Sequence, residues 1–236
     1  MINFALMAAA VTLGAAVQRT IGFGFALVAA PALELVRPGS VPVTVLCLAF
    51  PMTVGMAIGE RAHVDGRGFG WILVGRVAGT VVGLAVLTTL PPDALSVALG
   101  GLIVVAVVMS SAGLDVEPTP TVATGAGFLS GVMGTTSAVG GPALAVVYQR
   151  RPGPELRSTL AAAFVLGTAI SFAALLAAGQ VAGANVILAL ELVPALVAGL
   201  AAGPALARRV DGRWLRPAVL SFAAVAGLAI VVRGLV

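Results

Sequence analysis

Apolar residues form long stretches along this chain, and the polar residues gather in short segments between them. A helix needs roughly 20 predominantly apolar residues to cross a bilayer. Six stretches have about that length and predict membrane-spanning helices at residues 41–59, 69–90, 94–114, 156–178, 186–207 and 215–235. The pattern therefore predicts an all-α polytopic membrane protein.

Two further apolar stretches, residues 2–36 and 121–149, are long for one span and short for two full spans with a loop. Each carries glycines and polar residues near its middle, which predicts two shorter helices that meet at an irregular tip. Such a tip is tolerated inside a bilayer only where it is packed in protein or lines a wet cavity. We therefore expect both tips to lie inside the molecule.

The two broken stretches occupy matching places in the two halves of the chain. Their Pro-Ala-Leu triplets begin at Pro31 and Pro142, which are 111 residues apart. Each broken stretch precedes three predicted spans, which divides the chain into a first membrane repeat (residues 1–114), a linker (115–120) and a second membrane repeat (121–236). Interrupted apolar segments at the same place in two halves are the best sequence indication of a transporter's binding site.

A second pair of matching segments supports a duplication. Residues 78–83 and 198–203 both carry the Gly-x-x-x-Gly spacing that lets two helix backbones approach closely. We interpret these glycines as packing residues. The packing could lie within one chain or between the subunits of a homodimer.

The loop arginines favour a model in which each broken stretch is a hairpin that enters and leaves on one side. Nine arginines then share one side of the membrane, and only Arg37 and Arg233 lie on the other. If each stretch crossed once instead, the split would be eight to three. Cytoplasmic loops are enriched in arginine, so the hairpins fit better, and three crossings per half predict inverted repeats. The nine are Arg61, Arg67, Arg150, Arg151, Arg157, Arg208, Arg209, Arg213 and Arg216.

The composition excludes several classes of function. The chain is 60% hydrophobic and 9% charged, a profile that no soluble globular domain has. Its 13 arginines are scattered through short loops, which gives no support to nucleic-acid binding. Cys47 and His63 are the single cysteine and histidine, so we expect no disulfide within the chain, metal site, cofactor or nucleophile–base pair.

The tip of the second broken stretch has the features of an anion site. Gly134 is followed by the hydroxyl side chains of residues 135–137, and Gly140 and Gly141 precede a proline suited to a first helical turn. A helix that begins there presents free backbone N–H groups and the positive end of its dipole. The three hydroxyl groups, which either donate to an anion or merely cap the broken helix, belong to Thr135, Thr136 and Ser137.

The tip of the first broken stretch supplies a charge. Arg19 lies deep in an apolar stretch, where an unpaired charge is costly and is a functional candidate by default. Its planar guanidinium suits an oxyanion, although it could instead pair with an acid such as Glu34 or Glu191, or reach the membrane surface. The candidate binding residues at this tip are Gln18, Arg19, Thr20, Gly22 and Gly24.

Five other polar residues within or beside the predicted spans are candidates for gating or coupling. Arg76 lies about five residues inside its span and could equally reach the interface as a structural anchor. Glu34 and Glu191 could carry protons, although acids at helix ends are more often solvated. Tyr148 and Gln149 could line an access path, although tyrosine is ordinary at a membrane interface.

The glycine-broken segments resemble those of the TauE/SafE family of membrane permeases. Residues 127–134 running into 140–149 resemble one signature region, and residues 18–26 resemble the other. The resemblance covers essentially the whole chain. It implies a permease of the bacterial inner membrane that moves sulfite or organosulfonates, usually by export. The signature glycines are then Gly22, Gly24, Gly134, Gly140 and Gly141.

The chain departs from the family's commonest form at one place, since Thr135, Thr136 and Ser137 stand where glycines are often found. Taken together, the sequence predicts a multi-pass secondary transporter of a small oxyanion, with no enzymatic activity, and the family resemblance implies that the oxyanion contains sulfur. The two tips meet near the midplane and one half rocks against the other. The alternatives are an anion channel built on the same tips and a non-transporting membrane subunit of a larger complex.

Overall fold

The computed structural model describes residues 2–60, 63–113, 116–209 and 212–236, and no β-strand occurs among them. Ten α-helices follow one another along these residues. They are α1 Ile2–Ile21, α2 Phe25–Val36, α3 Val43–Glu60, α4 Gly66–Thr89, α5 Pro92–Ser111, α6 Pro120–Ser137, α7 Gly141–Tyr148, α8 Gly153–Ala177, α9 Gly183–Arg209 and α10 Gly212–Leu235.

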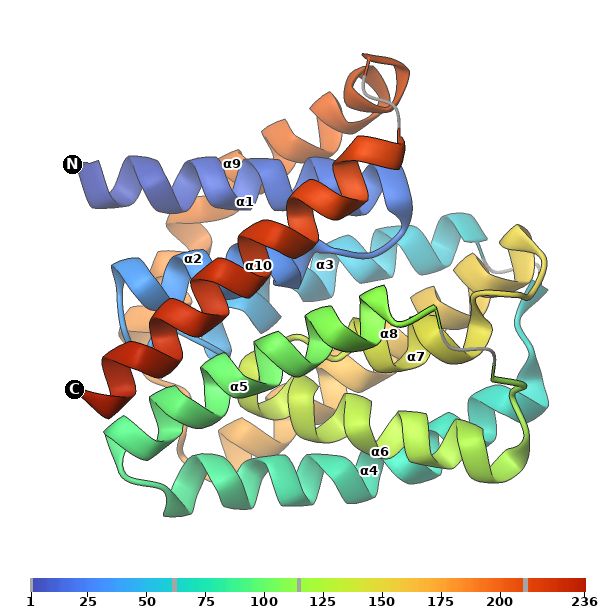
Figure 1. Cartoon of the computed structure of the whole chain (residues 1–236), viewed down its shortest axis with the longest axis horizontal. Helices are drawn as coiled ribbons and strands as arrows, with labels where there is room; N and C mark the ends of the chain where they lie inside the picture. The colour runs from blue at the N-terminus through green and yellow to red at the C-terminus, as the bar shows by residue number, and fades with distance from the viewer. Residues whose placement is uncertain (1, 61–62, 114–115, 210–211) are drawn as a thin grey trace.

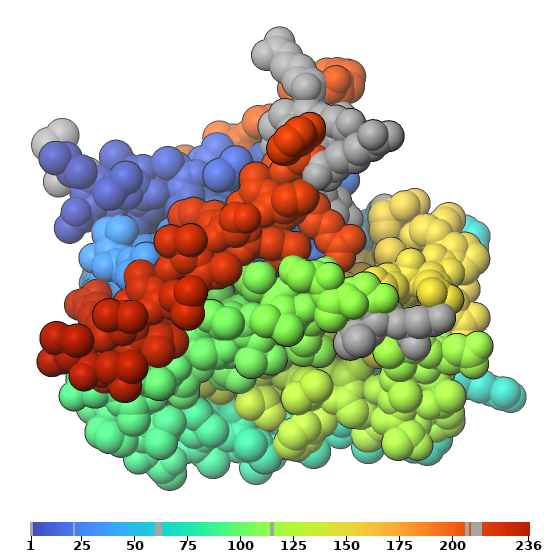
Figure 2. Space-filling view, in the orientation of Figure 1, coloured from blue at the N-terminus to red at the C-terminus, as the bar shows by residue number. Residues whose placement is uncertain are grey.

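The prediction of an all-α polytopic membrane protein is confirmed. Six of the described helices are long and apolar enough to cross a membrane, within α1, α4, α5, α8, α9 and α10. Large apolar side chains are exposed along the outer face of α10, which crosses in front of α5 in Figure 2; Val225 is 69% exposed and Val232 is 59% exposed. An apolar surface of this kind suits contact with lipid.

The two broken stretches differ from the expectation of paired short helices. Each is a long helix followed by a short one, with 20 and 12 residues in α1 and α2, and 18 and 8 in α6 and α7. At 1.5 Å per residue, α1 is about 30 Å long, which is the thickness of the bilayer core. The first helix is the longer of each pair because the interruption lies past the middle of the apolar stretch, at residues 22–24 and 138–140. It follows that α1 joins the candidate spans, whereas residues 43–59 in α3 form a slightly shorter apolar helix.

The predicted interruptions are present in both stretches. Gly22 and Gly24 have φ values of +92° and +122°, a region that glycine enters without steric strain. The second interruption places Ala138 in the left-handed region at φ +60°, and Pro142 stands in the first turn of α7. Both chain breaks therefore lie between the long and the short limb of a helical hairpin.

The two hairpins open toward opposite ends of the molecule. In Figure 1, α1 runs away from the N-terminus and α2 returns toward it, whereas α6 and α7 leave and return at the other end. Helix packing repeats in the same way, since α4 lies on α6 as α9 lies on α1, and the equivalent pairs α3–α8 and α5–α10 are in contact. This is the packing expected of inverted repeats. The inversion and the repeat boundaries stay predictions, and residues 114 and 115 lie outside the described residues.

Glycines allow α4 and α6 to pack with their backbones in contact. A Cβ atom added at Gly131 of α6 would lie 2.5 Å from the carbonyl oxygen of Arg76, and one added at Gly83 of α4 would lie 2.8 Å from that of Val132. In the other pair of helices, a Cβ atom at Gly203 of α9 would lie 2.6 Å from the Cβ of Arg19. The Gly-x-x-x-Gly segments thus pack within the chain. A homodimer built on them has no support in these contacts.

Most of the loop arginines lie at one end of the molecule, which we call the arginine-rich end. It holds the end of α3 and the start of α4, the α7–α8 connection, and the end of α9 and the start of α10 (Figure 1). Hydrogen bonds join two of these connections, because Tyr148 donates to the Asp65 carboxylate at 2.9 Å and the Asp65 N–H donates to Thr159 at 3.0 Å. At the opposite end, Arg233 donates to the carbonyl oxygen of Leu35. Arg61, like the side chains of residues 209 and 213, lies outside the described residues.

We predict that Gly79→Ala lowers the free energy of unfolding by about 1–3 kcal/mol, the usual range for overpacking. The new methyl group would lie 3.0 Å from the Cα of Phe128 and closer still to its carbonyl group. Thermal unfolding in detergent measures the effect. The matched control is Gly70→Ala in the same helix, where nothing lies within 4 Å of the added Cβ. That variant should be unchanged or slightly more stable, because alanine favours a helix. Equal behaviour of the two variants would contradict the packing account.

Candidate functional site

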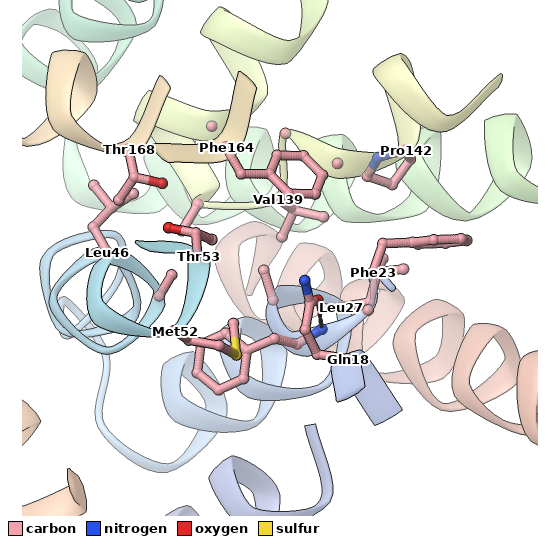
Figure 3. A pocket seen from close by; sticks show the side chains of 18 of the residues that line it. Gln18, Phe23, Leu27, Leu46, Met52, Thr53, Val139, Pro142, Phe164 and Thr168 are labelled. Atoms are coloured by element: carbon pink, nitrogen blue, oxygen red, sulfur yellow. Dashed lines mark hydrogen bonds between the residues drawn. The ribbon is translucent and has the colours of Figure 1, made fainter. Parts of the chain in front are cut away.

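A cavity lies where the two helix breaks meet. The break between α1 and α2 contributes Gly24, the break between α6 and α7 contributes residues 138–142, and α3, α4 and α8 complete the walls. In Figure 3, Gln18 and Leu27 lie across the cavity from Val139 and Phe164. The cavity has a volume of about 60 Å³, which is enough for several waters or a small ion.

Arg76 supplies a buried positive charge to this cavity. It lies near the middle of α4, is 4% exposed and lines the cavity wall. Its Nη1 donates to Ser130 of α6 at 2.5 Å and its Nη2 donates to Ser171 of α8 at 3.3 Å. The Ser171 hydroxyl shares a further hydrogen bond of 2.9 Å with Thr135. These partners orient the guanidinium, but all of them are neutral.

Arg76 has no carboxylate partner among the residues that the structure describes. Among the described residues, an ion pair joins Arg151 to Glu155. Both residues lie far along the chain from the centre of α4. The Nε of Arg76 is buried and has no hydrogen-bond partner. A buried charge without a counter-charge is costly unless something supplies one. The site is therefore electrostatically suited to an anion.

Three glycines leave the space that the guanidinium occupies. Added Cβ atoms would lie 2.6 Å from Nη2 at Gly134, 2.9 Å from Nη1 at Gly140 and 2.6 Å from Cζ at Gly167. These glycines come from α6, from the break after it and from α8. Any larger residue at these positions would displace the charge of Arg76. Two of the glycines in the second broken stretch thus have a steric role at the site.

The two short helices begin differently at the cavity. In α2 the first N–H group, that of Phe25, donates to the side-chain oxygen of Gln18 at 3.0 Å. In α7 the N-cap is Gly140, and no side chain caps the helix. The first N–H groups of a helix have no partner inside it, and its dipole places partial positive charge there. The start of α7 and the guanidinium of Arg76 therefore present positive potential to the same cavity.

The structure brings together six of the residues that the sequence singles out. They line the cavity from the two broken stretches and from α4, and they include glycines of both signature regions and the arginine of α4. The six are Gln18, Gly24, Arg76, Gly134, Gly140 and Gly141. Arg76 is 4% exposed and donates to α6 and α8, so its guanidinium does not reach the surface of the molecule.

The three hydroxyl side chains of the second tip lie behind the cavity wall. All three residues are fully buried, and each hydroxyl bonds to a neighbour. Thr135 contacts Ser171, Thr136 donates to the carbonyl oxygen of Gly83 at 3.3 Å, and Ser137 donates to its own helix at 2.8 Å. Their direct binding of an anion stays a prediction. In the structure Thr135 supports Arg76 through Ser171, and Thr136 joins α6 to α4.

Three candidate residues of the first tip also lie apart from the cavity. The Arg19 side chain is exposed near the end of α1, and its stem packs against Gly203 of α9. Thr20 donates to the carbonyl oxygen of Ala16 at 2.8 Å. Gly22 forms the backbone turn that follows α1. The structure thus places Arg19 at the arginine-rich end, as expected of an arginine that reaches the membrane surface.

Three of the remaining candidates for gating or coupling lie at or next to the ends of helices, and Glu191 lies more than two turns inside α9. Glu34 is 5% exposed and accepts from the Gly39 N–H at 3.1 Å, which stabilises the turn after α2. Glu191 is exposed on α9. Tyr148 is fully buried at the end of α7, and Gln149 lies beside a groove at the arginine-rich end. None of these four lines the cavity.

Sequence reasoning missed the polar residues that complete the site. Ser130 and Ser171 bond to Arg76, while Thr53 and Thr168 line the cavity from α3 and α8 (Figure 3). Thr168 and Ser171 are three residues apart, so they share one face of a helix. The sequence could have indicated these residues through hydroxyl side chains that recur at this spacing within an apolar span.

Comparison with known families agrees with this architecture. A family model described as "Sulfite exporter TauE/SafE" matches residues 6–230. No curated protein and no solved structure matches the chain. The matched residues begin within α1 and end within α10, so they include both breaks and the cavity between them. With this match across nearly the whole length of a multi-pass membrane protein, the chain belongs to the TauE/SafE family of membrane permeases.

Proposed function

We propose that this protein is a secondary transporter of a small sulfur-containing oxyanion, such as sulfite or a sulfonate. The anion occupies the cavity between the two helix breaks, where Arg76 and the first N–H groups of α7 bind it. The observation that carries this proposal is the buried guanidinium of Arg76, which lines the cavity without a carboxylate partner among the described residues. The family description supports sulfite as the substrate.

The chemistry of the cavity suits this class of ligand. A guanidinium donates through a planar fork that matches the spacing of two oxygens on an oxyanion. At the start of a helix, the free backbone N–H groups donate to anionic oxygens, and the positive end of the helix dipole favours the same negative charge. Apolar side chains form much of the remaining wall and would accept a short organic group; they include Leu27, Met52 and Phe164.

An apolar cluster closes the cavity at the end opposite the arginine-rich end, which we call the arginine-poor end, and a seal of this kind supports a carrier over an open channel. At the arginine-poor end, Val43, Leu46 and Leu175 form an apolar cluster against which Ala138 of the cavity wall packs. In a carrier, one end must stay sealed while the other opens. The rocking of one half against the other would move the seal from end to end.

The distribution of arginines supports an orientation in the membrane. The arginine-rich end then faces the cytoplasm, as the enrichment of arginine in cytoplasmic loops requires. The membrane is the inner membrane of a bacterium, as the family resemblance implies. In this orientation the apolar cluster at Leu46 seals the cavity from the outside.

We predict that Arg76→Gln weakens sulfite binding by about tenfold to a hundredfold, the usual worth of a charged hydrogen bond. The measurement is thermal stabilisation of the purified protein over a sulfite titration, because a ligand of the folded state raises apparent stability. Arg76→Lys keeps the charge without the fork and should bind with intermediate affinity. The matched control is Arg19→Gln, which should bind like the wild type. If Arg19→Gln loses binding while Arg76→Gln keeps it, the site belongs to the first tip and the proposal is wrong.

We predict counterflow in proteoliposomes. Vesicles preloaded with unlabelled sulfite should transiently accumulate labelled sulfite, because a carrier exchanges substrate through one alternating site. Vesicles loaded with chloride at the same ionic strength are the control. Sulfite flux without any exchange would instead indicate a channel, in which fixed dipoles act as a filter.

A further inference from the structure

Three hollows in the molecule form a line from the cavity to the surface. A constriction of about 10 Å³ shares Phe23, Gly24 and Leu27 with the cavity. The same constriction shares Arg216 and Leu220 with an outer groove of about 500 Å³. Because neighbouring hollows have wall residues in common, they lie next to one another, separated only by the side chains that they share. Together they extend from the cavity toward the arginine-rich end.

The constriction is apolar and narrow. Val17 and Leu27 from the first hairpin face Val219 and Leu220 of α10 across it. Phe23 stands between two glycines with positive φ values, so the backbone on either side of it can turn without a Cβ clash. In Figure 3 the Phe23 side chain extends away from the cavity centre. A small movement of Phe23 or Leu220 would therefore widen or close the constriction.

The outer groove has a polar wall at its mouth. Arg216 donates one hydrogen bond, from Nη2 to the carbonyl oxygen of Ser110 at 2.7 Å, and has no carboxylate partner among the described residues. Ser110 is 6% exposed, and its hydroxyl is buried without a hydrogen-bond partner. Ser111 and Gln149 line the same groove. A guanidinium beside an unpartnered hydroxyl is again a donor set for an oxyanion.

We infer that the groove holds a second anion subsite, formed by Arg216 and Ser110, and that the transported oxyanion passes between this subsite and the cavity through the Phe23–Leu220 constriction. This inference rests on the proposed transport of an oxyanion. The outer subsite concentrates the anion at the mouth, while Arg76 binds it inside. Two cationic sites on one route also favour the passage of an anion between them.

The first test compares two arginines of α10. Arg216→Gln should reduce sulfite flux into proteoliposomes at low ionic strength by about tenfold, and added salt should shrink the difference as the charge is screened. Sulfite should still stabilise the purified variant, because the Arg76 site remains. The matched control is Arg233→Gln, which removes an arginine of the same helix that also bonds to one carbonyl oxygen but lines none of the three hollows. Its flux should equal that of the wild type. Equal flux in both variants would overturn the subsite.

The second test blocks the constriction. In a Cys47→Ala background, Leu220→Cys should react with the anionic thiol reagent 2-sulfonatoethyl methanethiosulfonate, and the labelled protein should lose sulfite flux. Sulfite should slow the labelling, because both anions use the same route. Val225→Cys is the control, since this residue is 69% exposed on the same helix and lies outside the route. If Leu220→Cys does not fold, Phe23→Cys tests the same constriction. Mass spectrometry verifies the labelling, and full flux in a fully labelled protein would overturn the route.

The two proposals fail in different ways. If Arg76→Gln leaves sulfite binding intact, the proposed function itself is wrong. If Arg76→Gln loses binding while Arg216→Gln and the labelled Leu220→Cys protein transport normally, the central site stands and the anion uses another path. Loss of flux in Arg216→Gln with sulfite binding kept is the result that supports the second subsite.

Discussion

The burial of the Arg76 guanidinium is the constraint on which the rest of the site depends. A charge near the middle of a membrane helix is unfavourable unless it is hydrogen-bonded and paired. Here Ser130 and Ser171 hold the guanidinium in place with neutral hydroxyl groups. Hydrogen bonds of this kind orient the charge without neutralising it. The neutralising partner in the proposed account is the transported anion, and this couples the stability of the core to the occupancy of the cavity.

Glycine packing is what makes this burial possible. The backbones of α4 and α6 touch along Gly79 and Gly131, which brings Arg76 against the second break. At the break itself, Gly134 and Gly140 leave room for the guanidinium. The same small residues therefore pack the helices and shape the site. This explains how two broken hairpins with few polar side chains can form a selective cavity inside an apolar protein.

Much of the fold could be predicted from the pattern of apolar residues. The all-α membrane class and both interruptions followed from stretch lengths and from Gly22, Gly24 and Gly140. The lengths of α1 and α6 did not follow, because apolar composition shows where a helix can form but not at which residue it ends. The inverted arrangement agrees with the helix packing, but rests on the loop arginines and remains a prediction.

The candidate site was predicted in part, and the errors have a common cause. The glycine-rich tips do meet at a cavity, and the uncapped start of α7 lies there as expected. From the sequence we favoured Arg19 over Arg76, because Arg19 lies deep in an apolar stretch whereas Arg76 lies only about five residues inside its predicted span. The burial of a side chain depends on the helices packed around it, and α6 and α8 bury Arg76 whereas Arg19 is exposed at the end of α1. The side chains that hold Arg76 come from α6 and α8, a proximity that no local pattern contains.

The central claim is that an oxyanion binds between Arg76 and the first turn of α7. The most direct test is a crystal structure of the protein with selenite, in which anomalous scattering locates selenium without ambiguity. The account predicts an anomalous peak in the cavity, with oxygens at hydrogen-bond distance from the Arg76 guanidinium and the Gly141 N–H. A cavity without selenium, or a peak at Arg19 on the outer side of α1, would contradict it.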